Sequence, residues 1–176
     1  MENLNKYIEH TLLKQDATTE ALNKLYKEAK EHNFRGVCIN PAYVKTAKEA
    51  LKDTAVKVVT VIGFPLGANK TEVKAFEASV AKADGADEID MVINVTGMKD
   101  KNYNYVLEDI KAVKIACGDI PLKVILETDL LTKEEIKKAC ELAVEAGANF
   151  VKTSTGFVKN GLGAQVEDVK LMYNTV

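Results

Sequence analysis

The feature that most constrains this chain is a regular alternation of short runs rich in Val and Ile with longer amphipathic segments. The short runs cover residues 7–13, 35–40, 56–62, 86–94, 122–127 and 149–152. Apolar, β-branched runs of this length are typical of strands rather than helices. The pattern therefore predicts six strands, each followed by a longer segment with a different period.

The longer segments carry apolar residues at steps of three and four, which predicts amphipathic helices with charges on the opposite face. Residues 102–116 and 132–145 show this pattern, and a last helix is expected from about residue 166. Residues 71–83 show it too. There the apolar stripe consists of Val73, Phe76, Val80 and Ala83.

Side chains and glycines that favour helix ends stand between these segments. Capping pairs are predicted for Thr132 with Glu135, for Asn69 with Glu72, and for Asn40 before Pro41. Left-handed glycines that end helices are predicted at Gly36, Gly85, Gly118 and Gly147.

Strands that alternate with helices of this length indicate parallel β-α-β units in an α/β protein. Two architectures fit the pattern, a doubly wound open sheet and a (β/α) barrel. We find no linker and expect residues 1–176 to form a single domain. The length of 176 residues is short for an eight-fold barrel, which usually needs roughly 250.

Composition excludes several classes of protein. The net charge of −2 argues against a nucleic-acid surface, and no apolar run reaches the ~18 residues of a membrane span. The first residues lack the apolar stretch of a signal peptide. The three cysteines, Cys38, Cys117 and Cys140, lack C-x-x-C spacing, which disfavours disulfides and zinc and favours the cytoplasm.

An internal repeat places two charged residues at matching positions. Residues 83–90 resemble residues 145–152, and each copy has a helix-ending glycine followed by a strand. The repeat aligns Asp90 with Lys152 near the carboxyl ends of the fourth and sixth strands. In a barrel these strands share a layer, so the two side chains should lie at similar height. A structural buried ion pair is the alternative to a functional one.

A second lysine, Lys123, lies on the fifth strand, between the two strands that carry Asp90 and Lys152. Desolvation and a neighbouring cation would each lower the pKa of a lysine. A neutral lysine attacks carbonyls to form a Schiff base. Lys152, with Asp90 as proton carrier, suits that chemistry.

Six motifs, in order, resemble one enzyme family over essentially the whole chain. They are EHTLL at 9–13, VCINP at 37–41, VIGFPLG at 61–67, DEIDMVIN at 87–94, KVILET at 123–128 and VKTSTGF at 151–157. The last resembles the segment around the Schiff-base lysine of deoxyribose-phosphate aldolase. The chain is thus similar to that family.

The resemblance implies a (β/α)8 barrel that needs no metal or organic cofactor. It implies reversible cleavage of 2-deoxy-D-ribose 5-phosphate to D-glyceraldehyde 3-phosphate and acetaldehyde. Lys152 would form the imine, Asp90 would relay protons through water, and Lys123 would lie in the same site. Thr155, Thr11 and Cys38 would belong to the substrate-binding residues, although a free buried cysteine is the default for Cys38.

Two further positions have expectations of their own. We expect His10 to be structural. Glu9 stands where the family often has aspartate, and we expect its longer side chain near the mouth of the barrel.

The family continues past the position of Val176 with two more β-α units, which carry a second functional lysine and most of the phosphate site. We therefore expect an incomplete barrel of about six of the eight units. Solvent at the open side of this barrel would raise the pKa of Lys152. We expect self-association into a homo-oligomer to cover that side.

Three functions stay open at this point. The chain is the aldolase just described, acting on a small phosphorylated sugar or aldehyde. Otherwise it is a Schiff-base aldolase for another aldehyde, or a non-catalytic barrel fragment that self-associates. No nucleic acid or membrane partner is expected.

Overall fold

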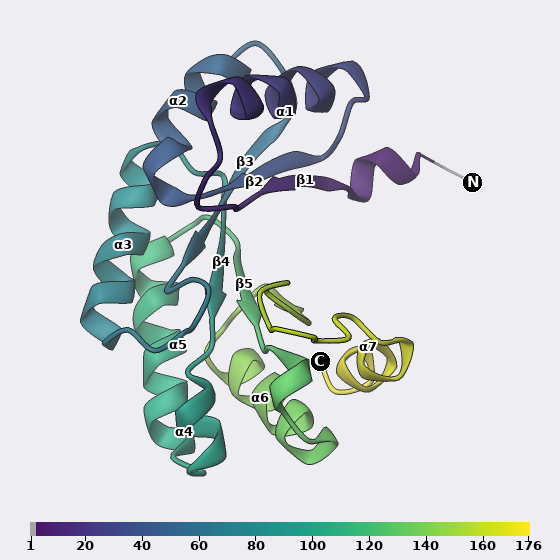
Figure 1. Cartoon of the computed structure of the whole chain (residues 1–176). Helices are drawn as coiled ribbons and strands as arrows, with labels where there is room; N and C mark the ends of the chain where they lie inside the picture. Colours follow the sequence, from purple (N-terminus) through teal and green to yellow (C-terminus); the bar gives the residue numbers. More distant parts are fainter. Residues whose placement is uncertain (1–2) are drawn as a thin grey trace.

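The computed structural model describes residues 3–176 and contains one sheet of six parallel strands (Figure 1). The strands are β1 (Glu9–Leu12), β2 (Gly36–Ile39), β3 (Lys57–Ile62), β4 (Glu88–Val92), β5 (Leu122–Ile125) and β6 (Phe150–Lys152). The helices are α1 (Thr19–Glu31), α2 (Val44–Leu51), α3 (Thr71–Ala83), α4 (Val95–Lys99), α5 (Tyr103–Cys117), α6 (Lys133–Glu145) and α7 (Val166–Tyr173). Three 3-10 turns, η1 (Leu4–Tyr7), η2 (Pro41–Tyr43) and η3 (Thr128–Leu130), complete the described elements.

The strand order β1-β2-β3-β4-β5-β6 follows the chain without a reversal. A doubly wound sheet would reverse its order at a switch point, so the fold is the barrel type. Figure 1 shows helices α1 to α6 following the outer side of the curved sheet, with α7 beyond β5 and α6. The predicted incomplete (β/α) barrel is confirmed, with β1 and β6 as the two edges.

The two faces of the sheet differ in chemistry. The main apolar core lies between the strands and the outer helices, where residues such as Ile89, Met91 and Ile110 are fully buried. The inner face carries only a small apolar cluster of Cys38, Val59 and Val61. The inner positions of β4, β5 and β6 carry the charged residues Glu88, Asp90, Lys123 and Lys152 beside the apolar Val92 and Ile125.

The predicted apolar stripe of α3 faces the wrong way. Val73, Phe76 and Val80 are exposed, Phe76 to 70 %. The buried positions of this helix are Lys74, Ala78 and Ala81. Alanines allow α3 to approach the sheet and α5 closely, and Lys74 pairs with an aspartate there, so the large apolar residues turn outward.

The predicted helix ends are confirmed in part. Thr132 and Glu135 form the reciprocal capping box of α6. Lys70 rather than Asn69 precedes α3, with no side-chain cap, so that prediction is wrong. The amide of Asn40 donates to the carbonyl of Leu13 instead of capping, although Pro41 does begin a 3-10 turn.

Three of the four glycines, Gly85, Gly118 and Gly147, have positive φ as predicted. Gly36 instead lies inside β2, so its predicted helix-ending role is wrong. A Cβ at Gly36 would lie 2.9 Å from the carbonyl oxygen of Lys57 on the neighbouring strand. Close packing of the two strands therefore accounts for a glycine at this position. No helix within residues 3–176 is long and apolar enough to cross a membrane.

Candidate active site

The inner face of the sheet brings the two repeat residues into direct contact. Nζ of Lys152 lies 2.6 Å from Oδ2 of Asp90, and Nζ of Lys123 lies 2.9 Å from Oδ1 of the same carboxylate. The strand register explains this meeting, because Asp90 pairs with Lys123 and Ile125 pairs with Lys152. Asp90 therefore offers one oxygen to each lysine, and the juxtaposition predicted from the repeat is present.

Lys152 is the last residue of β6, an edge strand, and its side chain is 36 % exposed. Asp90 is fully buried in the centre of β4. The amine therefore lies at the boundary between solvent and a buried carboxylate. A nucleophile that must meet a dissolved substrate needs such a position.

Lys123 contacts two further carboxylates on its other side. Its Nζ lies 2.7 Å from Oε2 of Glu88 and 3.1 Å from Oε1 of Glu9. Both of these glutamates also accept hydrogen bonds from the guanidinium of Arg35, which binds Glu88 through both terminal nitrogens.

The charged residues at this end of the cluster were not all predicted. Glu9 is the first residue of β1, so it lies at the amino end of the barrel and not at the mouth as expected. Arg35 and Glu88 were missed altogether. A signal was present for Glu88, because it precedes Asp90 by two residues and must share its face of an apolar strand.

The pKa of Lys152 is raised. This is the direction expected for the open side of an incomplete barrel and the opposite of that expected from desolvation and a neighbouring cation. Burial alone would lower this pKa, but the attraction and hydrogen bond of Asp90 outweigh burial. The pKa of Lys123 is raised in the same way, with Asp90, Glu88 and Glu9 together outweighing its burial. The expectation of a lowered pKa failed because it did not include the attraction of the carboxylates Asp90, Glu88 and Glu9.

Glu88 shows the reciprocal effect. Burial would raise its pKa, but hydrogen bonds from Arg35 and Lys123 lower it to about 2. The inner cluster therefore consists of ionised groups that stabilise one another.

Cys38 and Thr11 lie side by side on the inner face of β2 and β1. Burial, reinforced by Asp90, raises the pKa of the Cys38 thiol to about 12, so it stays protonated at neutral pH. The hydroxyl of Thr11 donates to the carbonyl of Glu9. Neither residue lines the cavity described below, and their substrate contacts stay predictions.

His10 points away from this cluster. Its Nε2 lies 2.8 Å from Oε2 of Glu28 on α1, and its ring packs edge-on against Phe34. These contacts agree with the structural role expected for this residue.

The loop after β6 is fixed by a buried glutamate that the sequence did not single out. Glu127 accepts a hydrogen bond from the backbone N–H of Thr155 at 3.2 Å and another from its hydroxyl. The N–H of Thr128 donates to the carbonyl of Thr153 at 2.9 Å. The carboxyl ends of β5 and β6 are thereby tied together.

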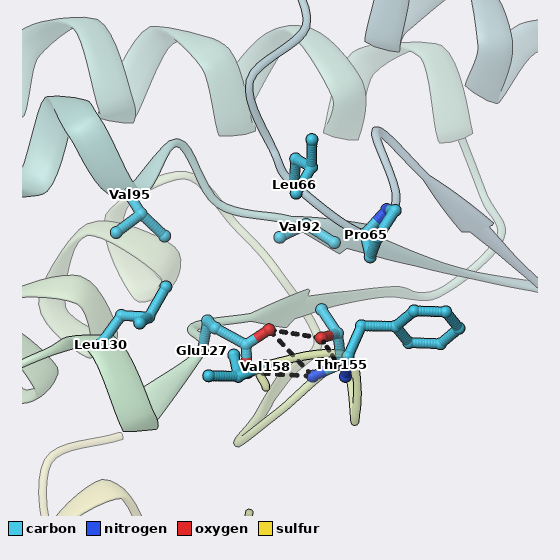
Figure 2. A pocket seen from close by; sticks show the side chains of 9 residues that line it. Pro65, Leu66, Val92, Val95, Glu127, Leu130, Thr155 and Val158 are labelled. Carbon is cyan, nitrogen blue, oxygen red and sulfur yellow. Dashed lines mark hydrogen bonds between the residues drawn. The ribbon is translucent and has the colours of Figure 1, made fainter. Parts of the chain in front are cut away.

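A cavity of about 320 Å³ opens at the same end of the sheet (Figure 2). It is lined by Pro65, Leu66, Val92, Val95, Glu127, Leu130, Thr155, Phe157 and Val158. Val92 is the last residue of β4, and the others follow β3, β4, β5 and β6, at the end where barrels of this type carry their chemistry. Thr155 lines the cavity, whereas Lys152, Lys123 and Asp90 do not.

Within residues 3–176 we find no group of three or more His, Cys, Asp or Glu side chains arranged to hold a metal ion. The expectation that the reaction needs no metal or organic cofactor stays a prediction.

Comparisons with known proteins agree with the geometry. The profile of the DeoC/LacD family aldolases matches residues 5–176. A deoxyribose-phosphate aldolase of Staphylococcus carnosus is 61 % identical over 171 residues, which cover 97 % of this chain and 77 % of that protein. Deoxyribose-phosphate aldolase 1 of Mesoplasma florum is 60 % identical over 98 % of this chain and 78 % of its own length.

Solved structures give the same result. A putative deoxyribose-phosphate aldolase from Coccidioides immitis superposes with a TM-score of 0.94 at 46 % identity, over 97 % of this chain and 66 % of that one. The tetrameric deoxyribose phosphate aldolase from Aeropyrum pernix superposes with a TM-score of 0.87 at 31 % identity, over 97 % of this chain and 71 % of that one. The chain thus spans about two thirds to four fifths of these proteins.

Proposed function

This chain belongs to the DeoC/LacD family of aldolases, and on that premise we propose that it cleaves 2-deoxy-D-ribose 5-phosphate through a Schiff base on Lys152. The products are acetaldehyde and D-glyceraldehyde 3-phosphate, and the reaction is reversible. The names of the relatives support the substrate. The observation that carries the proposal is the 2.6 Å contact between Nζ of Lys152 and Oδ2 of Asp90 at the boundary of solvent.

The reaction starts when the neutral amine of Lys152 attacks the C1 carbonyl of the open-chain sugar to give a carbinolamine. Uptake of one proton, relayed from solvent, and loss of water then leave a protonated imine. A base takes the proton of the C3 hydroxyl, and the electron pair of the C2–C3 bond moves toward the imine nitrogen. This step releases the phosphorylated aldehyde and leaves an enamine. Protonation of the enamine carbon and hydrolysis by water release acetaldehyde and restore the amine.

Asp90 suits both proton transfers. It is fully buried, and its carboxylate already accepts a hydrogen bond from each lysine. After imine formation Lys152 keeps one N–H, which can continue to donate to Oδ2. A water next to the carboxylate would then carry the proton to and from the substrate.

Borohydride reduction in the presence of acetaldehyde tests this function. We expect an ethyl adduct on Lys152, identified by mass spectrometry, and cleavage of deoxyribose 5-phosphate in a coupled assay. Lys152→Met should abolish both, whereas Lys24→Met, a change of an exposed lysine on α1, should abolish neither. Absence of any adduct on Lys152 in the unchanged protein would refute the Schiff-base proposal.

The edge of the sheet supports a further proposal, that copies of the chain associate. Phe150 on β6 is 51 % exposed, and Val169 and Tyr173 of α7 are exposed beside it. These residues line a groove of about 270 Å³ along the edge strand. We place the homo-oligomer contact here, and a compact monomer in sedimentation at micromolar concentration would contradict it.

The three buried free cysteines fit a reducing compartment, so we place the protein in the cytoplasm.

A further inference from the structure

Glu88 lies at the amino end of the inner face and has no part in the proposed reaction. It is fully buried, and it links the Arg35 guanidinium to the ammonium of Lys123. A buried glutamate so close to a reactive site raises the question of what it does for Lys152. The contacts of Lys123 provide the answer.

Lys123 donates a hydrogen bond to Asp90 and lies at ion-pair distance from two further carboxylates. An ammonium has three N–H donors, and Nζ of Lys123 lies within 3.1 Å of Glu9, Glu88 and Asp90. The contacts with Glu88 and Glu9 hold the ammonium on the amino-end side. The remaining direction leads to Oδ1 of Asp90.

This arrangement fixes the orientation of Asp90. With Oδ1 occupied by Lys123, Oδ2 is the oxygen left for Lys152, at 2.6 Å. Without the contacts from Glu88 and Glu9, Lys123 could move along the carboxylate and compete with Lys152 for both oxygens. The position of Asp90 against the reactive amine thus depends on residues at the opposite end of the cluster.

The charges of the cluster balance. The groups that face Lys123 and Lys152 from all neighbouring strands are Glu9 on β1, Arg35 before β2, Cys38 on β2, Lys57 on β3, Glu88 and Asp90 on β4, and the two lysines on β5 and β6. Cys38 is neutral, and Lys57 is half exposed, with its Nζ 3.3 Å from Oε1 of Glu88. Three carboxylates therefore face three inner cations, with Lys57 as a fourth cation at the rim.

We propose that Glu88 is a positioning residue for Lys152: through Lys123 it keeps Oδ1 of Asp90 occupied and Oδ2 directed at the reactive amine. Arg35 moderates this action, since it shares Glu88 with Lys123. The importance of this role for catalysis rests on the proposed function. Its effect on the titration of the Lys152 amine can be measured independently of that function.

A merely structural role for Glu88 would be to neutralise Arg35 at the bottom of the barrel. The two roles differ in one measurable respect. If Glu88 acts through Lys123, removing Glu88 and removing Arg35 change the protonation of Lys152 in opposite directions, and both changes disappear when Lys123 is replaced by methionine. If Glu88 acts only as a nearby charge, the same opposite shifts persist without Lys123.

The test is an NMR titration of the lysine amines after reductive ¹³C-methylation, with Lys152 assigned by its absence in Lys152→Met. Glu88→Gln removes a negative charge, so the midpoint of Lys152 should fall by about one pH unit. Arg35→Met leaves Glu88 free to draw Lys123 away from Asp90, so the midpoint should rise. Shifts of the same sign, no shift in a folded variant, or shifts of undiminished size in a Lys123→Met background overturn the proposal.

Matched controls make the same charge changes at the surface. Glu49→Gln and Lys52→Met alter an exposed ion pair on and just after α2, and should leave the Lys152 midpoint unchanged. Circular dichroism and thermal melting establish that each variant folds. If Glu88→Gln does not fold, Glu9→Gln removes the other amino-end carboxylate on Lys123 and should lower the midpoint in the same direction.

Borohydride trapping on the same variants separates this inference from the proposed function. An adduct on Lys152 with unshifted titrations refutes the positioning role and leaves the aldolase proposal intact. Signed titration shifts with no adduct in any folded protein refute the aldolase proposal and leave the electrostatic linkage standing.

Discussion

Two lysine–aspartate pairs on opposite sides of the sheet have the same N–O distance and opposite chemistry. Lys152 and Asp90 meet at 2.6 Å on the inner face, and Lys74 and Asp109 meet at 2.6 Å on the outer side, between α3 and α5. The pKa of Lys152 is raised, whereas the pKa of Lys74 is lowered. A short ion pair alone therefore does not determine the direction in which the pKa of a lysine shifts.

The surroundings of the two amines explain the difference. Lys74 is fully buried, and its desolvation outweighs the attraction of Asp109. Lys152 is partly exposed and feels Glu9 in addition to Asp90, which together outweigh its burial. Each amine also feels a second carboxylate, Glu77 for Lys74 and Glu9 for Lys152, so the balance between burial and attraction, and not the number of carboxylates, decides the direction.

The outer pair has a structural task. Nζ of Lys74 also donates to the carbonyl of Val92 at 3.1 Å, and the hydroxyl of Thr71 donates to Asp109 at 2.9 Å. The stem of Lys74 packs beneath Gly63, at the start of the loop after β3. One buried lysine thus joins α3 and α5 to the ends of β3 and β4, which form one wall of the cavity.

The largest expected effect in this comparison of the two ion pairs is the loss of activity on replacing Lys152. Lys152→Met should lower kcat by about 10⁴-fold or more, because the covalent intermediate is lost. Its free energy of unfolding should change by less than about 1 kcal/mol, since the side chain is partly exposed and Asp90 keeps Lys123. Urea unfolding and the cleavage assay measure the two quantities, and a large loss of stability would contradict the division of roles.

The reverse pattern is expected on the outer side. Lys74→Met should lower the free energy of unfolding by about 3–5 kcal/mol, because it leaves Asp109 buried and unpaired. Urea denaturation measures this loss. The double variant Lys74→Met, Asp109→Leu should recover most of it, since replacing a whole buried pair with apolar groups is often neutral. A single variant as stable as the unchanged protein would show that the pair contributes nothing.

Acid should weaken the inner cluster first. The pKa of Glu88 falls from its ordinary value of 4.5 to about 2 on folding. Its stabilisation is therefore complete above pH 4.5 and is lost as the pH falls toward 2, with a total on the order of 3 kcal/mol. Urea unfolding between pH 5 and pH 2 should show a steeper loss for the unchanged protein than for Glu88→Gln, and parallel curves would contradict this.

The smallest effect concerns the pH dependence of trapping. Because the pKa of Lys152 is raised, only a small neutral fraction exists near pH 7, and this fraction grows about tenfold per pH unit. The initial rate of borohydride trapping should rise accordingly between pH 7 and pH 9. In Asp90→Asn the pKa of Lys152 should be lower, so the trapping rate should reach its plateau at a lower pH. A rate that is already constant from pH 7 upward in the unchanged protein would contradict the raised pKa.

The sequence predicted the strands and the meeting of Asp90 with Lys152, because a repeat in a parallel fold determines register. It did not predict the outer pair, because Lys74 reads as a surface residue in a pattern that weighs apolar side chains alone. The same weighting placed Val73, Phe76 and Val80 inside. Long-range partners such as Arg35 and Glu88 are separated by 53 residues, and no local pattern reports their contact.

The balance of three carboxylates against three inner cations has a consequence for the energy profile of the proposed reaction. Lys152 is itself one of the three cations, so loss of its proton would leave the carboxylates in excess. The cluster therefore favours the protonated amine in the resting enzyme. The imine that follows carries the same positive charge at the same nitrogen, and the cluster therefore favours it as strongly as the ammonium. The site is adapted to the electron-withdrawing intermediate rather than to the nucleophile that forms it.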